Sequence, residues 1–125
     1  MSVSKIVNHG FFSNIFWREH YFYKKGDKHE GHTHILDHAT IVIKGSVEVK
    51  IEGKEPYNVS APAVIEIEKE KLHEFTALED ETIYMCVFAT NEFTDTLIDM
   101  TTKQKEKYLK NILCKDCGGC ESNTV

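Results

Sequence analysis

Apolar and polar residues alternate with a period of two along most of the chain up to about residue 90. Val47, Val49 and Ile51, for example, are separated by charged residues, which is typical of an antiparallel strand with one buried face. Residues 82–90 form a nearly continuous apolar run, which predicts a strand buried on both faces. Turn-forming residues recur about every eight to ten positions. We therefore predict seven or eight short strands arranged as an all-β sandwich or barrel.

Three local patterns refine this prediction. Residues 1–10 end in Asn8-His9-Gly10, a turn signal, and we expect them to form a lead-in segment. Residues 11–23 are rich in aromatic side chains and predict a strand, with His20 on its outer surface. Gly45-Ser46 lies between two strand patterns and predicts a two-residue hairpin.

After Thr90 the period changes from that of a strand to that of a helix. Phe93, Leu97 and Met100 are spaced as on one helical face. Thr101-x-x-Gln104 matches a capping box and predicts the start of a second helix. The predicted organisation is a β-barrel domain over residues 1–90, a helical C-terminal extension over residues 91–113, and a cysteine-rich, flexible tail over residues 114–125.

Composition and charge restrict the functions that the chain can have. Its 125 residues suffice for one domain with a single core, and 41% apolar and 28% charged residues are ordinary for a globular protein. A net charge of −5 without a basic block argues against a nucleic-acid-binding surface. The sequence has no apolar run long enough for a transmembrane helix and no apolar secretory signal at its start, so we expect no membrane partner and a cytoplasmic location.

The candidate chemistry is concentrated in histidines. Four of the seven fall between residues 29 and 38. In an extended chain His32 and His34 point to the same face, which is how a strand offers two imidazoles to one metal ion. A bend before His38 would return it to the same centre, and His73 lies in a later strand pattern. Solvated loop histidines are the alternative, but the combined spacing favours a metal site of three or four histidines.

The same residues resemble a known family. Gly26-x5-His32-x-His34-x3-His38-x6-Gly45 is similar to the first motif of the cupins, with His38 where that family usually has glutamate. Of the second cupin motif, His73 is retained. The resemblance covers roughly residues 20–90 and implies a double-stranded β-helix, or jelly roll, of the small single-domain RmlC-like type. The helical tail follows this fold.

The resemblance and the histidines together imply one divalent metal ion held by His32, His34, His38 and His73. Four neutral ligands leave the charge of the ion intact, so the ion should attract a small anionic ligand. Iron is the leading candidate, and nickel, manganese and zinc are compatible, since selectivity depends on geometry and supply.

The leading functional interpretation is a small-molecule metalloenzyme, such as an iron-dependent dioxygenase of an anionic or enolisable substrate. The alternative is a non-catalytic metal- or ligand-binding module. No sequence feature identifies a catalytic acid or base. A homodimer is expected, because cupins commonly pair through a strand edge or an aromatic face.

Four cysteines are present, and three of them lie in the tail. Cys86 sits in the apolar run and is expected to be a small buried hydrophobe. Cys114, Cys117 and Cys120 have the spacing C-x2-C-x2-C, which can bind a soft metal through thiolates. Only three thiolates are present, so a second metal or cluster, redox or interchain chemistry, and a tail without function all remain open.

Overall fold

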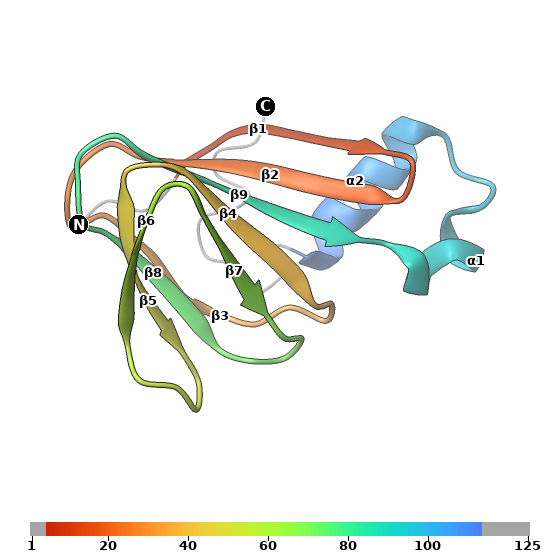
Figure 1. The fold of residues 1–125 in the computed structure, drawn as a ribbon. Coiled ribbons are helices and arrows are strands. Elements are labelled where there is room, and N and C mark those ends of the chain that lie inside the picture. The colour runs from red at the N-terminus through yellow and green to blue at the C-terminus, as the bar shows by residue number, and fades with distance from the viewer. Residues whose placement is uncertain (1–4, 114–125) are drawn as a thin grey trace.

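The computed structural model describes residues 5–113, except for the side chains of Glu30 and His32. The described residues form two antiparallel sheets that face each other (Figure 1). One sheet has the strand order β1-β2-β9-β4-β7 and the other the order β3-β8-β5-β6. The strands are β1 (Lys5–Phe12), β2 (Ile15–Phe22), β3 (Lys28–His32), β4 (His38–Lys44), β5 (Ser46–Ile51), β6 (Tyr57–Ser60), β7 (Ala63–Ile67), β8 (His73–Ala77) and β9 (Thr82–Ala89). The predicted all-β architecture is confirmed.

The N-terminal prediction was wrong, because the lead-in segment is a strand. Strand β1 runs through Gly10, and the turn lies at Ser13 and Asn14, so the described residues form nine strands. Gly10 pairs with Trp17 of β2, and a Cβ atom on Gly10 would lie 2.4 Å from the indole ring. Gly10 therefore makes room for the Trp17 ring and does not end the segment.

The predicted hairpin at Gly45 is also wrong. Strand β4 belongs to the five-stranded sheet and β5 to the four-stranded sheet, so the chain crosses from one sheet to the other at this point. Gly45 has a φ of +83°, and a Cβ atom there would lie 2.3 Å from Oγ1 of Thr82. Glycine is needed here for the crossing, both for its backbone conformation and for its size.

Alternate residues of each strand face the space between the sheets. The inner face of β2 carries Phe16, Arg18, His20 and Phe22, all at most 1% exposed. The predicted outer position of His20 is therefore wrong, because the register with β9 pairs it with the inward-facing Tyr84. The interior of the barrel thus contains polar and charged groups among its apolar side chains.

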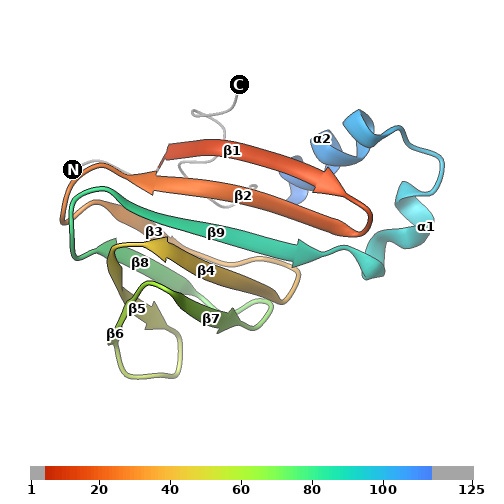
Figure 2. The same cartoon turned by 45° about the horizontal axis from the view of Figure 1, so that its top comes forward.

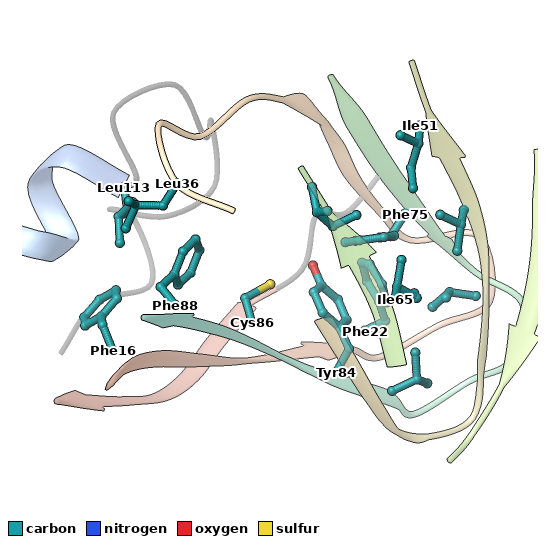
Figure 3. Packing of buried hydrophobic residues seen from close by; sticks show 14 of the residues in the cluster. Phe16, Phe22, Leu36, Ile51, Ile65, Phe75, Tyr84, Cys86, Phe88 and Leu113 are labelled. Atoms are coloured by element: carbon teal, nitrogen blue, oxygen red, sulfur yellow. The ribbon is translucent and has the colours of Figure 1, made fainter. Parts of the chain in front are cut away.

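The apolar core has two parts along the barrel. In Figure 3, one group contains Phe16, Leu36, Phe88 and Leu113, and the other contains Phe22, Ile51, Ile65, Phe75 and Tyr84. Phe16 lies near the start of β2 and Phe88 near the end of β9, so the first group closes one end of the barrel. Cys86 is buried, as predicted.

The chain after β9 is helical. A 3₁₀ turn, η1 (Asn91–Phe93), leads into the short α1 (Thr94–Leu97) and then into α2 (Thr102–Leu113), which lies alongside β1 (Figure 2). The predicted capping box forms: the Gln104 N–H donates to Oγ1 of Thr101 at 3.1 Å, and the Thr101 N–H donates to Oε1 of Gln104 at 2.9 Å. Among residues 5–113, no helix has the length and apolar character that crossing a membrane requires.

Candidate metal centre

Three histidines converge inside the barrel near the end that α2 covers. His34 lies in the loop after β3, His38 begins β4 and His73 begins β8. One ring nitrogen from each lies within 4.8 Å of the others, and the ring centroids are 5.2–5.3 Å apart. The three side chains are 5%, 6% and 1% exposed, respectively. Segments far apart in the sequence therefore meet as a buried cluster of imidazoles.

Two hydrogen bonds from backbone N–H groups hold the loop that carries His34. The N–H of Glu70 donates to the His34 carbonyl at 2.7 Å, and the N–H of Lys69 donates to Oδ1 of Asp37 at 2.7 Å. The loop before β4 is thereby joined to the turn before β8, where His73 begins the strand. The expectation that His34 lies in an extended strand was wrong, since β3 ends at His32. The convergence comes from the loop.

The fourth predicted ligand is only partly described. The backbone of His32 pairs with His73 in the β3–β8 ladder. The side chain of His32 lies outside the described residues, so its role as a ligand stays a prediction. Cys114, Cys117 and Cys120 also lie outside the described residues, and the second metal or redox site predicted for them is untested.

The environment of His73 favours the neutral, ligand form of its imidazole. Burial lowers the pKa of His73, and the charge of Arg18 acts in the same direction. A hydrogen bond from Nδ1 to the Lys71 carbonyl, 3.0 Å long, opposes this shift. Because a carbonyl only accepts, this bond places the proton on Nδ1 and leaves Nε2 as the available donor to a metal.

Aromatic packing orients the other two imidazoles. The Phe88 ring stacks on His38 with centroids 4.6 Å apart and meets His34 edge-on at 5.3 Å. Phe88 itself is fully buried. A ring held in this way restricts the rotation of both histidines about their side-chain torsions, so the pair is pre-oriented for a common ligand.

The donor set suits a divalent transition metal. Three neutral nitrogen donors are found in zinc, copper, iron and nickel sites. Metal–nitrogen bonds of about 2.0–2.1 Å require donors on one ion to lie within about 4.2 Å of each other. The observed limit of 4.8 Å is close to that span, and small side-chain rotations would close the difference.

Further polar side chains lie deeper in the barrel, and sequence reasoning gave them no role. His20 stacks on Tyr84 with centroids 4.7 Å apart, and Nδ1 of His29 is hydrogen-bonded to the Tyr84 hydroxyl. The guanidinium carbon of Arg18 lies 5.3 Å from the centroid of the Phe88 ring. Strand alternation places Arg18 and His20 on the same face as Phe16, but the sequence alone did not show that this face of β2 points into the barrel.

Comparison with known proteins identifies the fold. No family model matches the sequence, and no curated protein matches it. Among solved structures, KdgF from Halomonas sp. superposes with a TM-score of 0.59 at 25% identity, covering 70% of this chain and 79% of that one. An RmlC-like cupin with a double-stranded β-helix fold from Methanocaldococcus jannaschii gives 0.59 at 17% identity, with 77% and 86% covered. The DMSP lyase DddQ from Ruegeria pomeroyi gives 0.57 at 14% identity, with 63% and 40% covered.

The fold and the site together define a β-barrel protein with a buried histidine cluster. Two antiparallel sheets enclose that cluster, and the solved structures that superpose on the chain include several cupins. The chain has the double-stranded β-helix fold of these cupin structures, followed by a short C-terminal helix. His38 is part of this cluster.

Proposed function

We propose that the protein is a metal-dependent enzyme that acts on a small molecule. The observation that supports this most directly is the convergence of His34, His38 and His73, which offers three buried nitrogen donors to one ion. His32 is the proposed fourth ligand, in keeping with its pairing with His73. The three described histidines would hold the ion, and the apolar group around Phe88 would limit the access of water to it.

Iron is the proposed metal and an oxygen-dependent reaction the proposed chemistry. A bound divalent iron ion would supply Lewis acidity and a redox centre for the reaction of dioxygen with an anionic or enolisable substrate. Neutral histidine ligands would leave the charge of the ion undiminished, which favours an anionic substrate. Nickel, manganese and zinc suit the same donors, so the metal must be identified by analysis.

A non-catalytic metal- or ligand-binding module is the second candidate. The observation in its favour is the burial of the cluster, because the three imidazoles are at most 6% exposed. A closed site of this kind would retain an ion without turnover.

Metal analysis combined with oxygen uptake distinguishes the two candidates. Stoichiometric iron that consumes dioxygen supports the enzyme, whereas tightly held zinc without an exchangeable water supports the module. His34→Ala and His73→Ala should each abolish metal retention. His9→Ala is the matched control, because His9 lies on β1 and bonds Glu106 of α2, and it should retain metal fully. If the wild-type protein binds no metal, the enzyme is refuted, and of the second candidate only a module that binds a ligand without metal remains.

We also propose a homodimer formed through the outer face of the five-stranded sheet. Val64, Ile43 and Ile15 on this face are 65%, 48% and 41% exposed. A groove of about 510 Å³ on the same face is lined in part by Ile15 and Val87. An apolar sheet face of this kind is typical of an interface between subunits. Light scattering should give a dimer for the wild type and a monomer for Val64→Glu, and a monomeric wild type refutes the proposal.

A further inference from the structure

Helix α2 ends at the same end of the barrel as the histidine cluster. Its last residue, Leu113, is 1% exposed and belongs to the apolar group that also contains Leu36 and Phe88 (Figure 3). Phe88 in turn stacks on His38, with ring centroids 4.6 Å apart. The last described residue of the chain therefore packs among the side chains that cover the candidate metal centre.

Side chains on two faces of α2 hold the helix in this position. Leu109 is fully buried in the core. Glu106 bonds His9 of β1, and the Lys105 ammonium lies 5.7 Å from the centroid of the Phe11 ring. These contacts fix the point at which the cysteine-rich tail leaves the helix.

The small exposed part of the cluster lies on the loop next to this point. His34 and His38 are 5% and 6% exposed, whereas His73 is 1% exposed. His34 and His38 stand on either side of Leu36, which packs in the same apolar group as the end of α2. Ile35, next to His34, is 47% exposed, so the surface is one residue away. An added ligand would therefore approach the cluster from the side on which the tail begins.

The described side chains supply only nitrogen donors to the cluster. Among residues 5–113, the one cysteine is Cys86, and neither it nor a carboxylate joins the group of His34, His38 and His73. Three neutral imidazoles leave the charge of a divalent ion intact and leave positions open on it, even if His32 is a further ligand. An anionic donor carried by the chain itself would suit such a position.

The tail carries three donors of this kind, at positions 114, 117 and 120. An extended chain advances about 3.3–3.6 Å per residue, so the seven residues from Leu113 to Cys120 span at most about 25 Å. Facing sheets pack about 10 Å apart, so this length exceeds the depth of a barrel interior. The tail is thus long enough to bring a thiolate to the cluster.

We propose that a cysteine thiolate of the tail binds the metal ion held by His34, His38 and His73, at the position that an anionic substrate would take. This inference rests on the metal centre proposed above. The thiol releases its proton to the solvent, and a lone pair of its sulfur forms the bond to the ion. Because the thiolate is an anion attached to the chain, the tail would close the site until a substrate anion displaces it.

The test follows cobalt(II) binding to the full-length protein by absorption, with a reductant keeping the thiols free. A cobalt–thiolate bond gives a charge-transfer band in the near ultraviolet, which cobalt bound by nitrogen and oxygen alone does not give. The proteins compared are the wild type, His34→Ala, His73→Ala, a triple serine variant (Cys114→Ser, Cys117→Ser and Cys120→Ser), and the control Cys86→Ala, which removes the buried thiol of the barrel.

We expect one cobalt ion and a charge-transfer band in the wild type and in Cys86→Ala. The triple serine variant should still bind one ion but without the band, and the band should disappear in both histidine variants. Azide is then titrated into the cobalt-loaded proteins. If the thiolate occupies the open position in nine-tenths of the molecules, its removal in the triple serine variant should raise the affinity for azide about 10-fold.

Three outcomes overturn the proposal alone. These are a histidine-bound cobalt without the band in the wild type, a band that persists in His34→Ala and His73→Ala because the cysteines bind an ion of their own, and equal azide affinity in the wild type and the triple serine variant. If the wild type binds no cobalt, the proposed function fails as well. If both histidine variants fail to fold, stoichiometry decides: one ion in both the wild type and the triple serine variant supports the proposal, and the loss of an ion in the triple serine variant overturns it.

Discussion

Phe88 offers the sharpest test of how the barrel orders its histidines. Its ring stacks on His38, meets His34 edge-on and lies under the guanidinium of Arg18. Replacing Phe88 by leucine keeps most of the buried volume but removes these three contacts and the tilted contact with the Phe16 ring, whose centroid lies 6.1 Å away. The change therefore separates packing of the core from orientation of the imidazoles.

The size of the effect follows from these contacts. A volume-conserving apolar exchange in a core costs up to about 1.5 kcal/mol. Each lost aromatic pair adds about 0.5–1.5 kcal/mol, and the cation–π contact adds a similar amount. Phe88→Leu should thus lower the free energy of unfolding by about 2–4 kcal/mol. Metal affinity should fall about 10- to 100-fold, as is usual when the groups that orient ligands are lost.

Phe22→Leu is the matched control for Phe88→Leu. Phe22 is also fully buried, but its ring packs on Tyr84, with centroids 5.2 Å apart, in the other part of the core. We expect it to lose about 1–3 kcal/mol of stability and to keep wild-type metal affinity. Urea unfolding of the metal-free proteins and competition with a chromophoric chelator measure the two quantities. Equal metal affinity in the two variants would refute the orienting role of Phe88.

Three further predictions concern stability. Burial holds the folded-state pKa of His73 below 6.5, so the unfolded chain takes up the proton first as the pH falls. The metal-free protein should therefore lose stability as the pH falls through 6.5, and urea unfolding midpoints above and below pH 6.5 should show this loss. The loss should be smaller in His73→Gln. Gly45→Ala should lower the free energy of unfolding by more than the backbone strain of about 1–2 kcal/mol, because the added methyl group meets Thr82. Gly53 has a φ of +84° and open space around it, so Gly53→Ala should cost only that strain. Equal unfolding free energies of the two variants would refute the steric argument. Thr101→Ala should remove about 1 kcal/mol and speed hydrogen exchange at the start of α2, and unchanged exchange there would contradict the observed cap.

Much of the fold was predicted from the alternation of apolar and polar residues in the strands. Where this prediction was wrong, the cause is local. In β2 both faces mix apolar and polar residues, since Trp17 and Tyr21 alternate with Arg18 and His20. The parity of the strand is therefore ambiguous until its pairing with β9 is known, and Arg18 could not be placed. Gly10 resembled a turn residue because its real role, making room for the Trp17 ring, depends on a neighbouring strand.

The histidine cluster was predictable for a different reason. His34 and His38 follow the spacing of the first cupin motif, and His73 matches the histidine of the second cupin motif. The path of the chain between them was not predictable, because the loop after β3 is held by contacts with the turn near residue 70. Such long-range hydrogen bonds leave no periodic signal in the sequence.

The bonds from Glu70 to His34 and from Lys69 to Asp37 also bear on how this site could change over evolution. They join two surface segments, and the spacing of the histidine nitrogens depends on that junction as well as on the sheets. Loops accept insertions and deletions more readily than strands do. A lengthened segment on either side of the junction would therefore retune the preference for one ion over another while leaving the barrel stable. Length variation at these two segments is where we expect descendants of this protein to have diverged in chemistry.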